Sequence, residues 1–178
     1  NIQNEKNKIF YYESSRGCPF NCSYCLSSID KTVRFADIQK VFQDIQLFFD
    51  SNVPLVKFVD RTFNLKEDRY IKIWQYIIDN WNGITTMHFE IEAHILSQRA
   101  FEVLSNMPEH AIQFEIGIQS VNPKTLIACG RSPNFATIAS NVKKIPKTIH
   151  VHLDLIAGLP YENINDFSVS FDKTILLV

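Results

Sequence analysis

Short runs of alternating apolar and polar residues take turns along this chain with longer runs in which apolar residues recur every three or four positions. The first kind of run predicts β-strands, and the second predicts amphipathic helices. The predicted strands are residues 8–15, 54–60, 85–95, 111–120 and 148–158. The predicted helices cover residues 37–50 and 70–81, begin at Ser97, Asn122 and Asn134, and end with one that carries Phe167, Phe171 and Ile175. This order predicts an α/β fold with a parallel sheet and right-handed crossovers.

The last three predicted strands each have one polar face, and this feature separates two architectures. In residues 111–120, for example, Gln113 and Glu115 alternate with Phe114 and Ile116. A doubly wound sheet is covered by helices on both sides, so its strands are apolar on both faces. An antiparallel sheet with one wet face would show the same alternation, but the intervening helices argue against it. The pattern therefore predicts a barrel-like sheet with helices outside and a polar, wet cavity inside.

The length of the chain limits how complete such a barrel can be. An eightfold barrel needs about 250 residues, whereas this chain has 178 and supplies roughly five β/α units. We therefore expect one domain, residues 1–178, that forms a partial, open barrel. Because the chain starts with Asn and stops inside an apolar run, we interpret it as a fragment of a longer protein. The end of the barrel and any flanking domains are then missing.

Composition and charge narrow the class of protein further. The chain is 46% hydrophobic and contains 14 Phe, enough to build a buried core. Its formal net charge is −1 and it has no basic run, so bulk electrostatic binding of nucleic acid or of an anionic membrane is not indicated. No apolar stretch is long enough for a membrane span, and no signal-peptide pattern is present. We expect a cytoplasmic protein without a membrane partner.

Three of the four cysteines lie within eight residues, in the stretch RGCPFNCSYC. They follow the first predicted strand, and active sites of parallel α/β folds collect at the carboxyl ends of strands. Gly17 and Pro19 interrupt regular structure, so that Cys18, Cys22 and Cys25 can converge. Three thiolates leave one position of a tetrahedral metal site open. In a cubane iron–sulfur cluster they leave one iron without a protein ligand, where a substrate or cofactor can be chelated.

Two other interpretations of the cysteines remain open at this point. A zinc site is one, because C-x2-C pairs are common zinc ligands and Cys129 or a histidine would complete the set. Structural zinc usually uses two such pairs, however, and the chain contains no second one. Disulfides are the other interpretation, and they are disfavoured because nothing indicates secretion. We favour an iron–sulfur cluster and treat Cys129, which is remote in sequence, as uninvolved.

The stretch RGCPFNCSYC resembles the C-x3-C-x-aromatic-C signature of the radical S-adenosylmethionine enzymes. The order of the predicted elements resembles their partial (β/α)6 TIM-like barrel, and the resemblance covers nearly the whole chain. The stretches FEIGIQS and LDLIAGLP look like fourth-strand and fifth-strand motifs of this family. Together with VKFVDRTFN and HFEIEAH, they look most like a branch whose members often carry an N-terminal cobalamin-binding domain. No such domain is present in these residues.

The resemblance implies a radical S-adenosylmethionine enzyme. Cys18, Cys22 and Cys25 would be the catalytic and metal-binding residues that hold a [4Fe-4S] cluster, and S-adenosylmethionine would chelate the open iron. Reductive cleavage of S-adenosylmethionine would give a 5′-deoxyadenosyl radical, which abstracts hydrogen from a substrate that the sequence does not identify. Methyl transfer with cobalamin, bound by a domain outside these residues, is an outcome that the branch suggests. The implied partner is an electron donor of the flavodoxin or ferredoxin type.

The resemblance also implies eight cofactor contacts. They lie in the cysteine stretch or at the ends of the second to fifth strands, and are Tyr24, Asp60, Arg61, Glu92, Gln119, Ile156, Gly158 and Leu159. Tyr24 would contact adenine, and the last three residues would cradle it. Asp60 and Arg61 stand where many members have a Gly-Gly-Glu stretch, so their backbone would receive the methionine amino group. Glu92 and Gln119 would bind that amino group or the ribose hydroxyls.

Other titratable residues lie deeper along the predicted inner faces. We expect a structural charge network at the floor of the barrel, made of Lys57, Glu90, Glu115, His152 and Asp154. His88, His94 and His150 are alternative acids or bases beside a substrate, although an isolated histidine is more often structural. The alternative function is a non-catalytic interaction module in which the cysteines bind zinc and the cavity binds a ligand or RNA. A third expectation is that the isolated fragment is inactive.

Overall fold

The computed structural model describes residues 8–132 and 134–177. Within them, five parallel strands form one sheet in the order β1-β4-β5-β6-β7. Their bounds are Ile9–Tyr12 (β1), Leu55–Phe58 (β4), Thr86–Ile91 (β5), Ile112–Gln119 (β6) and His150–Leu155 (β7). A small antiparallel pair, β2 (Ser15–Arg16) and β3 (Arg34–Phe35), lies outside this sheet. The predicted α/β fold with a parallel, partly closed sheet is confirmed.

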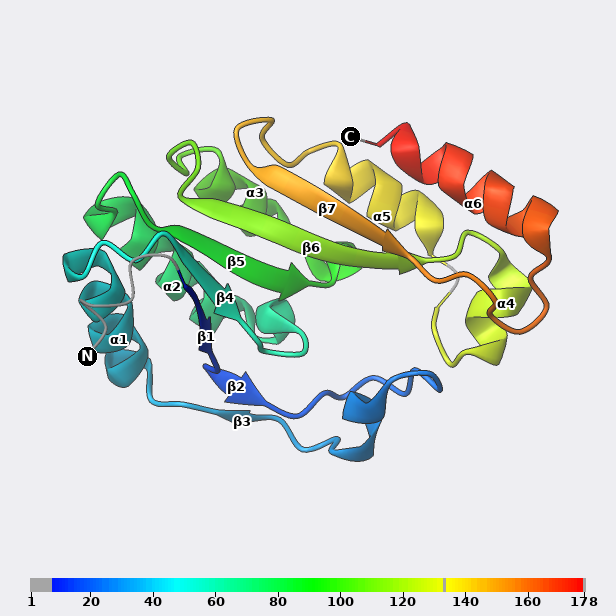
Figure 1. Cartoon of the computed structure of the whole chain (residues 1–178), viewed down its shortest axis with the longest axis horizontal. Helices are drawn as coiled ribbons and strands as arrows, with labels where there is room; N and C mark the ends of the chain where they lie inside the picture. The colour runs from blue at the N-terminus through cyan, green and yellow to red at the C-terminus, as the bar shows by residue number, and fades with distance from the viewer. Residues whose placement is uncertain (1–7, 133, 178) are drawn as a thin grey trace.

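Helices follow each of the parallel strands. They are α1 (Ile38–Asp50), α2 (Glu67–Asn80), α3 (Gln98–Leu104), α4 (Pro123–Ala128), α5 (Phe135–Val142) and α6 (Ile164–Ile175). Three short 3-10 helices, η2 (Leu26–Ile29), η3 (Phe63–Leu65) and η4 (Ala93–Ile95), interrupt the loops. Figure 1 shows α1, α2, α3 and α5 behind the sheet, with its other face open to the viewer. No helix of the described residues is long and apolar enough to cross a membrane.

The helix starts follow local side-chain chemistry. The side chain of Ser97 accepts a hydrogen bond from the backbone N–H of Ala100, and that of Asn122 accepts bonds from the backbone of Lys124 and Thr125. Such caps satisfy N–H groups that have no partner inside the helix. The helix starts predicted at Ser97 and Asn122 are therefore present, and these caps fix where α3 and α4 begin.

The outer face of the sheet carries the aromatic core. Phe58, Phe89 and Phe114 project from β4, β5 and β6 and are fully buried. The ring of Phe89 lies 4.2 Å from that of Phe63, and the ring of Trp74 on α2 lies 5.5 Å from that of Phe114. Burial of these large apolar surfaces is the main force that attaches the helices to the sheet.

The inner face of the same strands is polar, and the pairing register orders it into rows. One row runs across the sheet through Tyr11, Lys57, His88, Gln113 and His150. The next row toward the carboxyl ends contains Glu90, Glu115 and His152. Side chains alternate between the two faces of a strand. The alternation of apolar and polar residues in the sequence therefore produces both the outer core and the inner polar rows.

The third parallel strand is shorter than predicted. The sequence pattern extends it to residue 95, but β5 ends at Ile91 and the chain turns into η4. The cause is Asn64, whose side chain donates a hydrogen bond to the Glu92 carbonyl and accepts one from the Glu92 N–H, each at 2.9 Å. Glu92 and His94 therefore lie beyond the strand, at the edge of the sheet where the loops gather.

The last helix presents an unexpected face to the sheet. Phe171 and Ile175 are about half exposed, at 50% and 55%, whereas Ser170 and Thr174 are buried. Ser170 is fixed there because its hydroxyl accepts a hydrogen bond of 3.1 Å from the backbone N–H of Val121, at the end of β6. The helix is present as predicted, but its buried face carries Ser170 and Thr174 instead of Phe171 and Ile175.

Candidate functional site

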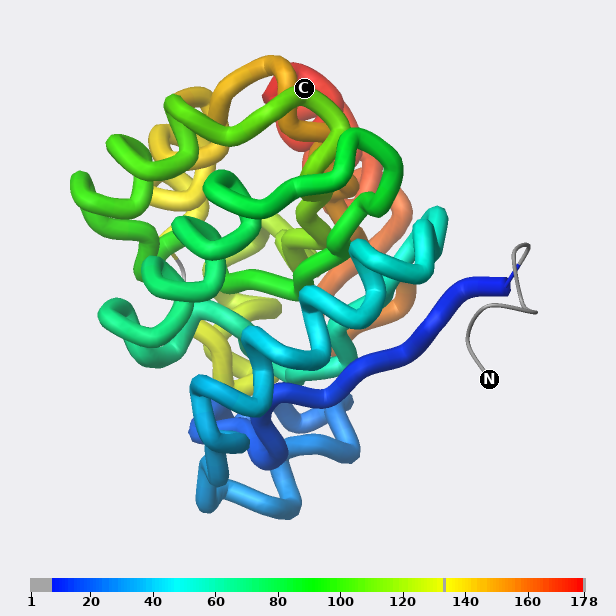
Figure 2. The backbone as a smooth tube through the Cα atoms, turned by 90° about the vertical axis from the view of Figure 1, so that its left-hand side faces the viewer, coloured from blue at the N-terminus to red at the C-terminus, as the bar shows by residue number. Residues whose placement is uncertain are grey.

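The cysteines lie on a loop, residues 17–32, that is closed at its base. The strands β2 and β3 pair on either side of it, and the Cys18 N–H donates a hydrogen bond of 2.9 Å to the Asp30 carbonyl. Gly17 has φ +96°, and a Cβ at this position would lie 2.3 Å from the Thr32 carbonyl oxygen. Only glycine permits this approach. Figure 2 shows the loop as a separate lobe at one end of the sheet.

Asp60, at the end of β4, anchors the chain that enters this loop. Its fully buried carboxylate accepts hydrogen bonds from the Ser14 N–H (3.0 Å), the Ser14 hydroxyl (2.8 Å) and the Ser15 hydroxyl (2.5 Å). Burial raises the pKa of Asp60, although the serine bonds oppose the shift. The Asp60 side chain therefore holds the entry to the cysteine loop in place through its hydrogen bonds with Ser14 and Ser15.

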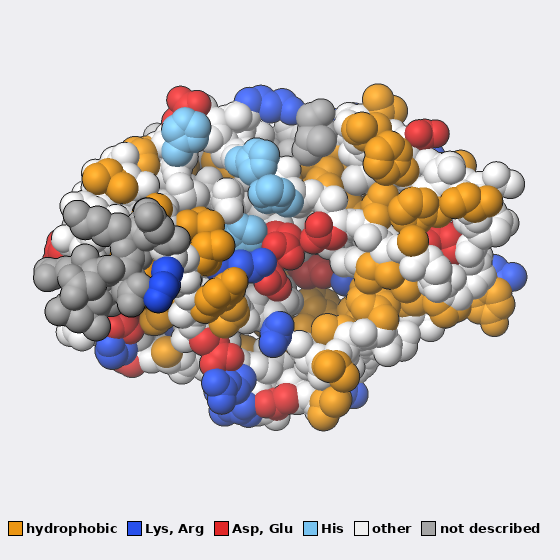
Figure 3. Space-filling view, in the orientation of Figure 1, with side chains coloured by type: hydrophobic (Ala, Val, Ile, Leu, Met, Phe, Trp, Pro, Cys, Tyr) orange, Lys and Arg blue, Asp and Glu red, His pale blue; other side chains and the backbone are white. Residues whose placement is uncertain are grey.

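The cysteine loop covers a cavity of about 160 Å³ at the carboxyl ends of the strands. All three cysteines of the loop line it, and none forms a disulfide. Its other lining residues are Phe20, Tyr24, Arg61, Thr62, Glu90, Ile91, Glu92, Glu115, Gly117, Gln119, Arg131 and Asp154. Figure 3 shows a hollow near the middle of this face in which acidic side chains gather, with histidines beside it.

The donor set fits a [4Fe-4S] cluster with one open iron. Three free thiols of one loop share a single cavity, and such a cluster takes each thiolate at a different iron. The Cys18 sulfur lies 3.8 Å from the Thr62 hydroxyl, and the Cys22 sulfur lies 3.6 Å from the Arg131 guanidinium. Across residues 8–132 and 134–177, no three His, Cys, Asp or Glu side chains are grouped tightly enough to hold a single metal ion.

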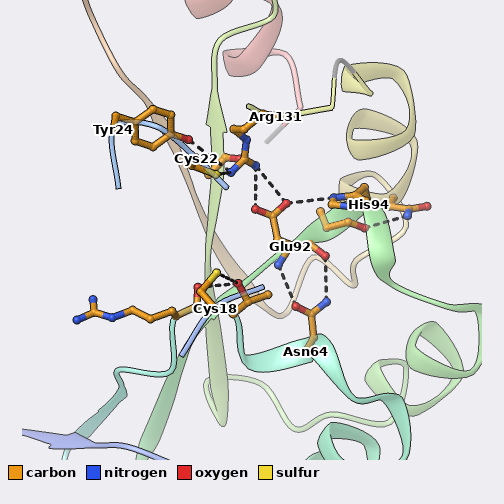
Figure 4. Close-up of polar contacts among 12 residues, drawn as sticks. Cys18, Cys22, Tyr24, Asn64, Glu92, His94 and Arg131 are labelled. Atoms are coloured by element: carbon orange, nitrogen blue, oxygen red, sulfur yellow. Dashed lines mark hydrogen bonds and ion pairs between the residues drawn. The ribbon is translucent and has the colours of Figure 1, made fainter. Parts of the chain in front are cut away.

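Arg131, which follows α4, is the central cation of the site. Its guanidinium donates to both carboxylate oxygens of Glu92, at 2.8 and 3.1 Å, and to the carbonyl oxygen of Gly117 at 3.2 Å. It also lies 3.5 Å from the Tyr24 hydroxyl (Figure 4). Burial lowers the pKa of Arg131, but the charge of Glu92 and the neighbouring Tyr24 and Cys22 outweigh it and raise the pKa. Arg131 therefore stays charged.

Glu92 is held from three sides. Besides Arg131, the His94 ring lies 3.1 Å from its carboxylate, and Asn64 holds its backbone (Figure 4). The side chains of Glu92 and Arg131 are only 12% and 13% exposed. Because water reaches little of either side chain, each charge depends on the other for its solvation.

A second polar network lies on the inner face of the sheet, and its carboxylates Glu90 and Glu115 also line the cavity. The Lys57 ammonium lies 2.9 Å from the Glu115 carboxylate and 3.6 Å from that of Glu90. The His88 ring lies 3.0 Å from Glu115 through one nitrogen and 2.7 Å from the Gln113 amide through the other. These groups pair with one another, as buried or half-buried charges must.

Burial and neighbouring charges separate the pKa values of this network. Burial and the adjacent Glu115 raise the pKa of Glu90, and the same two causes raise the pKa of Asp154. Burial also raises the pKa of Glu115, but the hydrogen bonds and charges of Lys57 and His88 lower it overall. Burial and the charge of Lys57 lower the pKa of His88.

The structure brings most of the sequence-predicted site residues together. Those that line the cavity are Cys18, Cys22, Cys25, Tyr24, Arg61, Glu92 and Gln119. The predicted residues outside its lining, among those described, are Asp60, Ile156, Gly158 and Leu159. Their contacts with the methionine amino group and with adenine stay predictions.

Sequence reasoning missed Arg131 and the surroundings of Cys129. Arg131 follows Gly130, and the one available signal was that an inward Glu92 needs a cation. The Cys129 carbonyl accepts a hydrogen bond of 3.0 Å from the Ser23 N–H, so the backbone of this residue touches the cysteine loop. Gln119 has φ +65°, and its side chain folds over Gly117, where a Cβ would lie 2.0 Å from the amide nitrogen.

The chain matches a protein family and is similar to known proteins. The model of the radical SAM superfamily matches residues 12–173. The chain belongs to this superfamily. The predicted family, an enzyme family, is thereby confirmed. An uncharacterized methyltransferase of Pyrococcus horikoshii, PH0819, is 27% identical over 158 residues, which cover 84% of this chain and 33% of that protein.

Solved structures show the same fold at low sequence identity. The radical S-adenosylmethionine methyltransferase TsrM from Kitasatospora setae superposes with a TM-score of 0.81 at 14% identity, over 97% of this chain and 34% of TsrM. Coproporphyrinogen III oxidase (HemN) from Escherichia coli superposes with a TM-score of 0.66 at 14% identity, over 96% of this chain and 42% of HemN. The chain spans about a third of PH0819 and of TsrM.

Proposed function

We propose that this chain is the catalytic core of a radical S-adenosylmethionine enzyme. In this proposal Cys18, Cys22 and Cys25 hold a [4Fe-4S] cluster, and the cavity beneath them binds S-adenosylmethionine. The observation that carries the proposal is that three free thiols of one loop line a single cavity at the carboxyl ends of a parallel sheet. When bound, the cluster supplies the single electron that begins radical chemistry on S-adenosylmethionine.

The side chains of the cavity suit the charges of that molecule. Arg61 and Arg131 are cations that can face the methionine carboxylate, and Glu92 is an anion that can face the amino group. The Glu92–Arg131 pair is already oriented, so little reorganisation is required when a zwitterion of matching charges arrives. Gln119 and Tyr24 lie in the same lining, and in this proposal they contact the ribose and adenine.

We further propose methyl transfer as the reaction class, with cobalamin bound outside the described residues. The names of two relatives support this: PH0819 is called a methyltransferase, and TsrM is a methyltransferase whose structure contains cobalamin and a [4Fe-4S] cluster. A flavodoxin or ferredoxin would supply the electron. A cytoplasmic location suits a cluster that oxygen damages.

The proposal is tested by reconstituting the chain with iron and sulfide without oxygen. The wild-type chain should bind about four iron and four sulfide, and a reductant with S-adenosylmethionine should yield 5′-deoxyadenosine. Cys22→Ala should lose both the cluster and the product. Cys129→Ala is the matched control, because its thiol does not line the cavity, and it should retain both. Stoichiometric zinc in place of iron, or a full cluster in Cys22→Ala, would contradict the proposal.

A further inference from the structure

The tip of the cysteine loop, residues 21–24, is held by a segment distant in sequence. This segment, residues 129–131, follows α4, and we call it the α4 clamp. The base of the loop is closed by its own neighbours through β2 and β3 and through the Cys18–Asp30 hydrogen bond. The tip has a local backbone hydrogen bond of 3.0 Å, from the Cys25 N–H to the Cys22 carbonyl, and its remaining support comes from what it touches across the cavity.

The backbone contacts between the clamp and the tip are close. The Ser23 N–H donates a hydrogen bond of 3.0 Å to the carbonyl of Cys129. Gly130 has φ +70°, and a Cβ there would lie 2.6 Å from the carbonyl oxygen of Asn21. The absence of a side chain at residue 130 thus lets two backbones meet, which is the position where only glycine fits.

Arg131 adds the side-chain part of the clamp. Its guanidinium reaches the Cys22 sulfur at 3.6 Å and the Tyr24 hydroxyl at 3.5 Å, while Glu92 fixes its other edge at 2.8 Å. Because Asn64 in turn holds the backbone of Glu92, the tip is tied through Arg131 to the end of β5. These contacts place residues 21–24 against the rigid part of the fold.

We propose that the α4 clamp holds the tip of the cysteine loop in its ligand-binding shape before any cluster is bound. The assignment of that shape to cluster binding rests on the proposed function. The physical reason is that ordering a free loop costs backbone conformational entropy. A loop that is already ordered in the folded chain loses little further entropy when the cluster binds. This is preorganisation. Arg131 is then a positioning residue for Cys22.

The chain offers a matched pair of variants for the test. Gly130→Ala and Gly83→Ala both put alanine at positive φ, +70° and +76°, and so share the backbone strain of that region. Only Gly130→Ala introduces a contact with the loop, since nothing lies within 4 Å of a Cβ at Gly83. Arg131→Gln removes the charged contact and leaves the backbone contacts intact.

The measurement is hydrogen exchange of the cluster-free chain, followed by mass spectrometry of peptides that cover residues 21–25. Gly130→Ala should speed exchange there by about tenfold or more, Arg131→Gln by a smaller factor, and Gly83→Ala not at all. Peptides from β5 and β6 should exchange as in the wild type in every variant, which shows that the sheet is folded. Unchanged protection of the tip in both Gly130→Ala and Arg131→Gln would overturn the proposal.

Cluster loading is measured separately, so the two proposals fail in different ways. If the wild type binds iron and sulfide but the tip stays protected in the variants, the clamp is wrong and the enzyme assignment stands. If the tip loosens in Gly130→Ala but the wild type binds no iron, the clamp is real and the cluster assignment is wrong. When both hold, Gly130→Ala should load less iron than Gly83→Ala under the same conditions.

Discussion

The two faces of the parallel sheet consist of alternate residues of the same strands, yet they differ in kind. On the outer face Phe58, Phe89 and Phe114 are fully buried against helices. On the inner face the side chains of Lys57 and Glu115 are 28% and 30% exposed and pair with each other. The outer face therefore supplies most of the stabilising apolar burial, whereas the inner face can carry charged groups because water and neighbouring charges still solvate them.

This difference explains how one sheet serves both stability and chemistry. Apolar burial on one face is sufficient to fix the strands, so the other face is free to hold groups that are costly to bury. The cysteine loop adds to the inner face from the carboxyl ends, where strand ends and loops leave a cavity. Substitutions on the two faces should therefore have different consequences, and this expectation can be measured.

The largest effect on stability should come from the outer face. Phe89→Ala removes a fully buried ring that contacts Phe58 and Phe63 at centroid distances of 4.6 and 4.2 Å. We expect a loss of about 3–5 kcal/mol in the free energy of unfolding, as for other large-to-small core substitutions. Urea unfolding followed by circular dichroism gives this value. A loss below about 1 kcal/mol would show that the outer face is not the stabilising core.

A smaller effect is expected from the inner face. Glu115→Leu removes the acceptor that Lys57 and His88 share, and leaves both without it. Because these groups are partly exposed, we expect a loss of roughly 1–2 kcal/mol, between the values for exposed and for buried ion pairs. The same urea experiment measures it, with Gln43→Leu at an exposed position of α1 as a control. A loss as large as that of Phe89→Ala would remove the distinction between the two faces.

The smallest effect concerns the pH dependence of the inner face. Burial and Lys57 lower the pKa of His88 in the folded chain, whereas an unfolded histidine titrates near about 6.5. As the pH falls below about 6.5 the unfolded chain takes up the proton first, so stability falls toward acid. Glu90, whose raised pKa acts in the opposite direction, contributes stability that is lost as the pH rises above its unfolded value.

Comparison of the wild type with His88→Gln isolates the contribution of His88 to the pH dependence of stability. Thermal unfolding between pH 7.5 and about 5.5 should show a smaller loss of stability in the variant than in the wild type. Parallel curves for the two proteins would mean that His88 titrates equally in the folded and unfolded chains.

Much of this architecture follows from local sequence signals, and the rest depends on contacts between distant segments. Alternation along residues 111–120 was sufficient to assign both faces of β6, since a strand has a period of two. The early end of β5 was not predictable, because it depends on Asn64, which is 28 residues from Glu92. The spacing of the three cysteines was sufficient to predict their common role. The α4 clamp could not be predicted in this way, because two of its contacts involve backbone atoms, and the sequence shows nothing of them except Gly130.

The proposed function depends most directly on an iron that the three cysteines leave open. The decisive measurement is the electron paramagnetic resonance spectrum of the reconstituted, reduced chain, recorded with and without S-adenosylmethionine. If the cluster has an open iron, the spectrum should be that of a reduced [4Fe-4S] cluster and should change when S-adenosylmethionine is added. A cluster signal that S-adenosylmethionine leaves unchanged, or no cluster signal at all, would contradict the account.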